Sequence, residues 1–169
     1  NKLPKLSGNI ALVTGAGGTI GSEIAKVFHE NGAEVICLDK DYESAKRTAE
    51  LCGENAFALK CDVSDRNKVK KAFKKIVLEF GGFDILISNA GIALEGKMDS
   101  LDDLIFDKSL KINLLSHHYL CQESLLVFRK QDLDKNNGSL LGGQFLFNVS
   151  KQALNPGKGF GAYGISKSA

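Results

Sequence analysis

Tyr163 and Lys167 stand four positions apart near the end of the chain, so on a helix their side chains would share one face. A tyrosine hydroxyl is a poor base at neutral pH, but a neighbouring ammonium group stabilises its phenolate. Such a pair can take a proton from an alcohol or return one to a carbonyl oxygen. Ser150 stands thirteen residues before Tyr163, and its hydroxyl can hold the same substrate oxygen. Together these residues predict proton transfer at an alcohol or carbonyl group.

A glycine-rich segment, TGAGGTIG at residues 14–21, lies between a predicted strand at 10–14 and a predicted helix from about 19 to 31. Glycines permit a tight turn that lets the backbone approach a pyrophosphate closely. The N–H groups and the positive end of the following helix then bind its charge. The residues predicted to bind a dinucleotide here are Gly15, Gly18, Thr19, Ile20 and Gly21.

Asp39 follows the second predicted strand, eighteen positions after Gly21. A carboxylate at this place can accept hydrogen bonds from the adenosine ribose hydroxyls, and it would repel a 2′-phosphate. The sequence therefore favours NAD over NADP. An alternative is that Asp39 merely starts a turn or caps the next helix, and the adjacent Lys40 weakens the discrimination.

Short apolar runs alternate with longer segments of helical periodicity, which predicts a Rossmann-type α/β fold with a doubly wound parallel sheet. The second, third and fourth strands are nearly continuous apolar runs, as is typical of strands covered by helices on both faces. Ser64 is predicted to cap the third helix. The predicted strands are 10–14, 34–38, 56–60, 84–88 and 144–149, and the predicted helices are 19–31, 42–52, 64–80, 101–129 and one from about 161, with a loop at 130–137.

The composition is that of an ordinary soluble globular domain, with 43% hydrophobic and 25% charged residues. A formal net charge of +2 gives no sign of a nucleic-acid partner. No apolar run approaches the ~20 residues of a membrane span. The four cysteines lack CxxC spacing, which favours free thiols in a reducing compartment and a cytoplasmic location. The three histidines lack metal-ligand spacing, so no metal site is predicted.

Later motifs resemble the short-chain dehydrogenase/reductase family over essentially the whole chain. Residues 14–21 fit the TGxxxGxG of its shorter branch only with Thr19 in place of a glycine, and they also fit the TGxxGxxG of its extended branch. Ser150 lies two residues after Asn148 rather than the usual three, a register that Lys151 occupies, but only Ser150 carries a hydroxyl. The features that favour the shorter branch are Asp62-Val63, the NNAG-like Ser88-Asn89-Ala90-Gly91, Asn113, and the YxxxK of Tyr163 and Lys167 with Ser150.

The resemblance implies particular roles. Asp62 and Val63 would contact the adenine, and Lys167 would also bond to the nicotinamide ribose. Asn113 would support a water that passes the proton onward from Lys167. The implied catalytic residues are Ser150, Tyr163, Lys167 and Asn113, and the further cofactor-binding residues are Asp62, Val63, Asn89, Ala90, Gly91, Tyr163 and Lys167.

The predicted function is NAD-dependent hydride transfer between nicotinamide and a polyol, sugar or hydroxy-aldehyde. Two alternatives remain, a sugar-nucleotide epimerase or dehydratase that retains its NAD, and a non-catalytic NAD(H) sensor. A narrower resemblance, in residues 147–158 and Lys2-Leu3-Pro4, is to dehydrogenase domains fused behind sugar-phosphate aldolases, which are associated with rhamnulose-phosphate cleavage and lactaldehyde oxidation.

The segment 1–169 is predicted to be a single NAD(P)-binding domain that is incomplete at its C-terminus, because only two residues follow Lys167. We expect the nicotinamide pocket of this segment to lack a wall and the segment to turn over substrate poorly. The resemblance also implies a homo-oligomer, with the helix around residues 114–127 in the interface.

Overall fold

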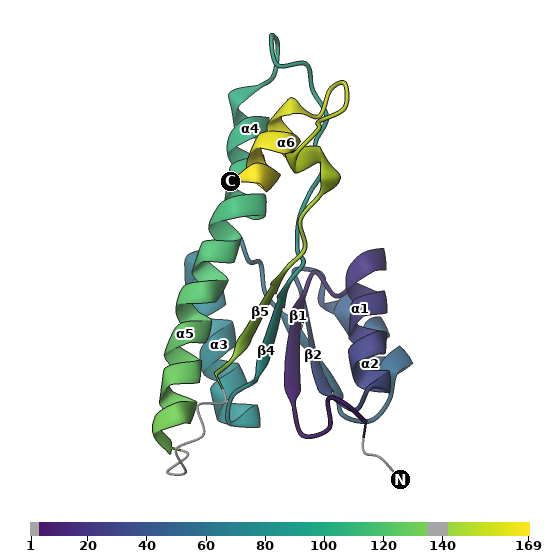
Figure 1. The fold of residues 1–169 in the computed structure, drawn as a ribbon, viewed down its shortest axis with the longest axis vertical. Coiled ribbons are helices and arrows are strands. Elements are labelled where there is room, and N and C mark those ends of the chain that lie inside the picture. Colours follow the sequence, from purple (N-terminus) through teal and green to yellow (C-terminus); the bar gives the residue numbers. More distant parts are fainter. Residues whose placement is uncertain (1–3, 135–141) are drawn as a thin grey trace.

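The structure, a computed structural model, describes residues 4–134 and 142–169 (Figure 1). A five-stranded parallel sheet has the order β3-β2-β1-β4-β5, so the chain moves outward from β1 first to one side and then to the other. This is the predicted doubly wound arrangement. The strands are β1 (Ile10–Thr14), β2 (Glu34–Asp39), β3 (Ala56–Lys60), β4 (Ile85–Ser88) and β5 (Gln144–Phe147).

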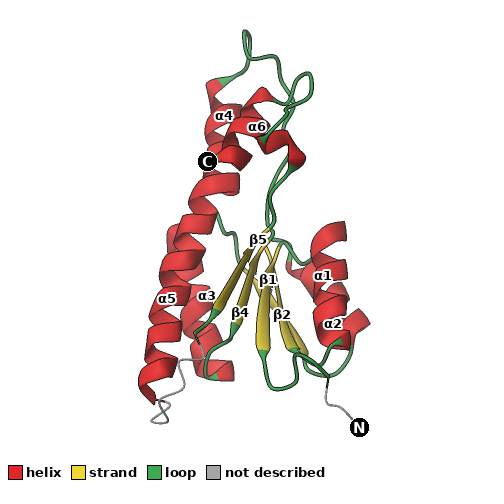
Figure 2. Cartoon of the chain, in the orientation of Figure 1, coloured by secondary structure: helices red, strands yellow, loops and turns green. Residues whose placement is uncertain are grey.

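Helices cover both faces of the sheet and its carboxyl-terminal edge (Figure 2). α1 and α2 pack together on one face, and α3 and α5 pack together on the other. α4 and α6 lie beyond the carboxyl ends of the strands, where ligands bind in sheets of this type. The helices are α1 (Thr19–Glu30), α2 (Tyr42–Cys52), α3 (Arg66–Phe80), α4 (Asp103–Leu110), the π-helical η1 (Lys111–Leu115), α5 (Ser116–Asp134), the 3₁₀ turn η2 (Lys151–Ala153) and α6 (Gly161–Ser168).

The two faces of the sheet carry cores of different character. Alternate residues of β1 point to opposite faces, with Ala11 and Val13 toward α1 and α2, and Leu12 toward α3 and α5. Small residues such as Ala25 and Ala45 dominate the first core, which allows α1 to approach the sheet closely. Large side chains fill the second core, including Phe73, Phe83 and Phe128 in edge-to-face contacts.

β3 corrects the expectation that the second, third and fourth strands are all covered on both faces. It is one of the two edge strands of the sheet and pairs with β2 alone. Leu59 is its one buried residue, whereas Phe57 is 38% exposed and packs against Phe80. The apolar run reflects packing on a partly covered edge rather than full burial.

Three element ends also differ from the prediction. Asp65, not Ser64, caps α3, because the Asp65 carboxylate accepts hydrogen bonds from the N–H groups of Asn67 and Lys68. α5 continues to Asp134 through the start of the predicted loop, and the rest of that loop up to residue 137 lies outside the described residues. β5 ends at Phe147 instead of residue 149. Within 4–134 and 142–169, no helix is both long and apolar enough to cross a membrane.

The Asp65→Ala variant tests the cap at the start of α3. Loss of the carboxylate leaves the N–H groups of Asn67 and Lys68 without a protein acceptor, so we expect the melting temperature to fall by about 2–4 °C. Asp65→Asn keeps an acceptor oxygen and should melt close to the wild type. Thermal unfolding followed by circular dichroism measures both variants, and equal melting of Asp65→Ala and the wild type would contradict the assignment.

Candidate active site

A cavity of about 520 Å³ opens at the carboxyl ends of the strands. Every residue that the sequence analysis assigned to cofactor binding or catalysis lines this cavity, except Asn113. The structure thus brings together segments that are far apart in the chain. The predicted residues in the lining are Gly15, Gly18, Thr19, Ile20, Gly21, Asp39, Asp62, Val63, Asn89, Ala90, Gly91, Ser150, Tyr163 and Lys167.

The glycine turn forms the part of the cavity next to α1. Gly15 has a φ of +65°, and a Cβ there would lie 2.9 Å from the Cα of Ala90, so a side chain would strain both the turn and its neighbour. α1 begins after Gly18 without a side-chain cap, and Thr19 and Ile20 of its first turn line the cavity. Uncapped N–H groups at a helix start are suited to binding an anion such as a pyrophosphate.

The Asp39 carboxylate is held in one orientation by two backbone donors. Its Oδ2 accepts from the N–H of Gly17 at 3.0 Å, and its Oδ1 accepts from the N–H of Asp41 at 3.0 Å. The alternative role of Asp39 as a helix cap is taken instead by Asp41, which accepts from the N–H of Glu43. Asp39 therefore does stabilise the local turn, and it also presents its carboxylate to the cavity together with Lys40.

Asp62 and Val63 follow β3 and line the same cavity. The Asp62 carboxylate accepts from the N–H of Ser64 at 3.0 Å and from its hydroxyl at 2.7 Å. Burial alone would raise the pKa of Asp62, but the hydrogen bonds from Ser64 outweigh it and lower that pKa. The carboxylate is thereby favoured in its charged form at the edge of the cavity.

Tyr163 and Lys167 lie on α6 and line the cavity together with Ser150. The Lys167 ammonium donates to the carbonyl oxygen of Asn148 at 2.9 Å, and burial lowers the pKa of Lys167. Ser150 precedes η2, and its hydroxyl oxygen accepts from the N–H of Gln152 at 3.2 Å. Lys151, which occupies the other possible register, is exposed and does not line the cavity.

Asn113 lies behind the cavity, in the π-helical η1, with 2% of its surface exposed. Its Oδ1 accepts from the N–H of Ile92, and its Nδ2 donates to the carbonyl oxygen of Ile92 and to the hydroxyl of Ser166. These bonds tie α6 to the segment after β4. The structure therefore gives the Asn113 side chain a positioning contact, and its support of a proton-relay water stays a prediction.

His117 joins β4 and β5 beneath the site, a contact that the sequence did not reveal. Its Nδ1 is hydrogen-bonded to the hydroxyl of Ser88, and its ring packs edge-on against Phe147. Burial, helped by the positive charge of Lys167, lowers the pKa of His117 to about 4. The imidazole is therefore neutral at physiological pH, as expected for a structural histidine.

The cavity also contains residues that the sequence analysis did not assign to the site. Most of them lie next to a recognised motif in the sequence, and that position is the signal by which they could have been predicted to line the cavity. They are Lys40, Cys61, Ile92, Ala93, Ile112, Asn148 and Val149.

A doubly wound sheet, an uncapped helix start behind a glycine turn and a carboxylate at the end of β2 are together typical of dinucleotide-binding α/β proteins. Residues 9–169 match the sequence model of the family described as short chain dehydrogenase. The chain belongs to that family, and its parallel sheet with flanking helices is the Rossmann-type fold.

Curated relatives resemble the chain at moderate identity. D-threitol dehydrogenase of Mycolicibacterium smegmatis is 31% identical over 96% of this chain and 64% of its own length. The 3-oxoacyl-[acyl-carrier-protein] reductase FabG of Vibrio cholerae is 32% identical over 81% of this chain and 57% of its own. An uncharacterized oxidoreductase of Bacillus subtilis, YuxG, is 32% identical over 96% of this chain but only 23% of its own length. The chain thus spans less than two thirds of these relatives.

Solved structures agree with this assignment. A short-chain type dehydrogenase/reductase from Mycobacterium marinum superposes with a TM-score of 0.89 at 27% identity, covering 99% of this chain and 65% of that one. A 3-ketoacyl-(acyl-carrier-protein) reductase from Brucella melitensis, complexed with NADH, gives a TM-score of 0.88 at 28% identity, covering 97% and 66%.

His117 predicts an acid-dependent loss of stability. Its pKa is about 4 in the folded chain, below the ordinary value of 6.5, so protonation favours the unfolded state. The corresponding stability is present above pH 6.5 and is lost as the pH falls toward 4. The free energy of unfolding of His117→Gln should therefore fall by about 2 kcal/mol less than that of the wild type over this pH range, after allowance for the partial exposure of the ring.

Urea unfolding at pH 7, 5.5 and 4.5 measures this effect. His118→Gln is the matched control, because His118 is the exposed neighbour on the same helix. The same decline with pH in the wild type and in both variants would rule out His117 as its source.

Proposed function

We propose that this protein is an NAD-dependent oxidoreductase that transfers a hydride between nicotinamide and an alcohol or carbonyl substrate. The observation that carries the proposal is the continuity of one cavity. Its lining runs from the glycine turn and Asp39 to Ser150, Tyr163 and Lys167. A dinucleotide bound along this cavity would have its adenosine end at Asp39 and its reactive end beside Tyr163.

The donor set of the cavity fits this cofactor. The uncapped start of α1 is suited to the pyrophosphate, and the Asp39 carboxylate to the adenosine ribose hydroxyls. Two backbone N–H groups hold that carboxylate, so it cannot easily turn away from a 2′-phosphate. NAD is therefore favoured over NADP despite the adjacent Lys40, and a related structure is complexed with NADH.

Ser150, Tyr163 and Lys167 would carry out the proton transfer. In oxidation, Tyr163 takes the proton from the substrate hydroxyl, and in reduction it returns a proton to the carbonyl oxygen. The Lys167 ammonium stabilises the phenolate of Tyr163, and the Ser150 hydroxyl holds the same substrate oxygen. When bound, the nicotinamide cofactor supplies the hydride acceptor or donor. Asn113 keeps α6 in register with the segment after β4 through Ser166 and Ile92.

The substrate class that we propose is a polyol, sugar or hydroxy-aldehyde. The similarity to D-threitol dehydrogenase supports a polyol. The resemblance to domains fused behind sugar-phosphate aldolases stays a prediction. The relative YuxG is compatible with it, because the segment that matches this chain is only 23% of the length of YuxG. Assembly into a homo-oligomer is also a proposal, and the exposed Leu125, Leu126 and Ile165 offer apolar surface that such a contact would bury.

The Asp39→Asn variant tests the choice of cofactor. The amide keeps one acceptor oxygen for the two backbone donors and loses the charge, so NADH affinity should fall about tenfold and the preference over NADPH should nearly vanish. Parallel fluorescence titrations with NADH and NADPH measure both affinities. Asp41→Asn is the matched control, because Asp41 caps α2 and does not line the cavity. An unchanged ratio in Asp39→Asn would refute the role of Asp39.

The Tyr163→Phe variant tests the proton transfer in the full-length gene product. We expect kcat to fall by about 100- to 10,000-fold with NADH affinity nearly unchanged, since only the acid-base group is lost. Steady-state formation of NADH from D-threitol and related polyols, with lactaldehyde included, gives the rates. Net NADH formation by the wild type also separates a dehydrogenase from an epimerase that recycles its cofactor.

Tyr119→Phe is the control for Tyr163→Phe, because the Tyr119 ring packs under Arg66 and does not line the cavity. Ser150→Ala should lower kcat as well. Turnover near wild type in Tyr163→Phe would overturn the proposed mechanism, and the same result in Ser150→Ala would overturn the choice of Ser150.

A further inference from the structure

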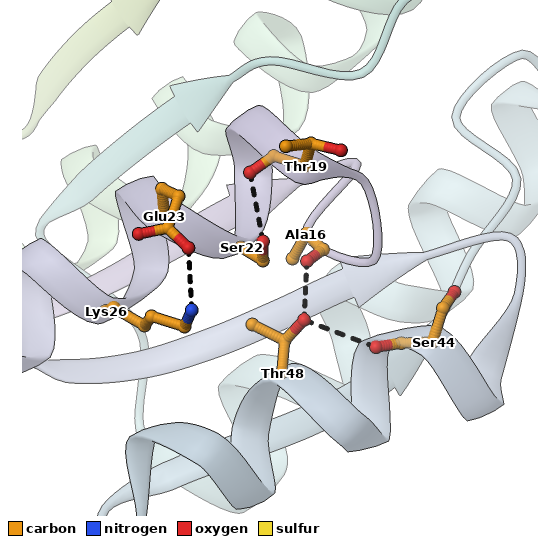
Figure 3. Close-up of polar contacts among 7 residues, drawn as sticks. All are labelled: Ala16, Thr19, Ser22, Glu23, Lys26, Ser44 and Thr48. Atoms are coloured by element: carbon orange, nitrogen blue, oxygen red, sulfur yellow. Dashed lines mark hydrogen bonds and ion pairs between the residues drawn. The ribbon is translucent and has the colours of Figure 1, made fainter.

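Thr48 contacts the glycine turn from α2 and belongs to none of the recognised motifs. It is 3% exposed, and its Oγ1 lies 2.8 Å from the carbonyl oxygen of Ala16 (Figure 3). The other contacts in Figure 3 stay within one helix, from Ser22 to Thr19 and from Lys26 to Glu23 in α1, and from Thr48 to Ser44 in α2. Thr48 is therefore the labelled side chain that joins the turn to a different helix.

The Thr48 hydroxyl has two carbonyl oxygens within reach but only one proton to donate. The oxygen of Ala16 is at 2.8 Å and that of Ser44, one helical turn earlier, is at 3.3 Å. A hydroxyl in a helix often bonds to the carbonyl four residues before it, without any further role. Here the shorter distance favours Ala16, whose buried carbonyl would otherwise lack a partner side chain.

The peptide group between Ala16 and Gly17 is fixed from both ends. Its carbonyl oxygen accepts from Thr48, and its N–H donates to Oδ2 of Asp39 at 3.0 Å. The N–H of Ala16 also donates to the carbonyl oxygen of Leu38, directly before Asp39. One rigid peptide unit thus connects α2, the turn and the Asp39 carboxylate at the end of β2.

α2 packs so closely on this peptide that a side chain at position 17 is excluded. A Cβ on Gly17 would overlap Ser44 and would lie 3.1 Å from Oδ2 of Asp39. Rotation of the peptide would therefore move the turn and break one of the two backbone hydrogen bonds that orient the Asp39 carboxylate. The hydrogen bond from Thr48 to this peptide therefore contributes to the position of both groups.

We propose that Thr48 is a positioning residue for cofactor binding, which holds the Ala16–Gly17 peptide so that the turn and Asp39 keep a fixed relative position. The inference rests on the proposed function, because it assigns the turn to the pyrophosphate and Asp39 to the ribose. Thr48 does not line the cavity, so it acts through these two groups rather than by contact with the ligand.

The Thr48→Val and Thr48→Ser variants test this inference by fluorescence titration with NADH. Valine keeps the shape and loses the hydroxyl, and we expect about five- to tenfold weaker NADH binding, the equivalent of one buried hydrogen bond. Serine restores the hydroxyl and should bind NADH within about twofold of the wild type. In Thr48→Val the affinity for ADP, measured by competition with NADH, should fall more than the affinity for adenosine. Adenosine would contact Asp39 but not the glycine turn, and Asp39 keeps its second donor, the N–H of Asp41.

Ser124→Ala is the matched control. It removes a buried hydroxyl that donates to a backbone carbonyl in α5, away from the cavity, and it should leave NADH binding unchanged. If Thr48→Val does not fold, Thr48→Ala and Thr48→Ser make the same comparison. Wild-type NADH affinity in a folded Thr48→Val or Thr48→Ala variant, or an equal loss for ADP and adenosine, overturns the inference. Absence of NADH binding by the wild type instead overturns the proposed function, and this inference with it.

Discussion

The carboxyl ends of β1 and β4 are joined by side-chain hydrogen bonds at the point where the strand order reverses. The Thr14 hydroxyl accepts from the N–H groups of Asn89 and Ala90, and Nδ2 of Asn89 donates to the carbonyl oxygen of Thr14. Parallel strands that separate at this point leave a crevice between their ends. Here the hydrogen bonds between Thr14 and Asn89 hold the two sides of the crevice together. The cavity at the carboxyl edge of the sheet depends on this connection.

Further polar contacts extend from this connection to the catalytic side. Nδ2 of Asn148 donates to Oδ1 of Asn89, and the carbonyl oxygen of Asn148 accepts from Lys167. The end of β5 and the proposed catalytic lysine are thus positioned relative to the glycine turn by a short series of hydrogen bonds. These groups are partly buried, and polar groups removed from water are more stable when they are bonded, so the network favours this arrangement.

Most of the fold could be predicted from the sequence because alternation of short apolar runs with helical periodicity is a local signal. The exceptions have particular physical causes. Ser64 and Asp65 are both good capping residues, and only the folded chain shows that Asp62 engages the Ser64 hydroxyl and leaves the cap to Asp65. The apolar residues of β3 do not reveal its place in the sheet. Only the structure shows that β3 lies at an edge and has one neighbouring strand.

The candidate site also has parts that the sequence predicts and parts that only the structure shows. Residues in compact motifs, such as Asp39, could be identified from the sequence, and the structure brings them to one cavity. Contacts between residues that share no motif could not be identified from the sequence. Examples are the contact of Thr48 with Ala16 and that of His117 with Ser88. Nothing in the sequence shows that three hydrogen bonds occupy the Asn113 amide, because those bonds depend on the packing of η1 against α6 and against the segment after β4.

Lys167 shows why the electrostatic balance of the site favours the proposed chemistry. Its ammonium is partly desolvated, and none of the ion pairs among residues 4–134 and 142–169 includes it. A desolvated cation without a carboxylate costs stability, and a carboxylate beside it would offset its charge. In the proposed mechanism this uncompensated charge acts beside Tyr163, the neighbour on the same helix face. His117, whose pKa is lowered by burial and by the charge of Lys167, is neutral at physiological pH and adds no further positive charge near Lys167.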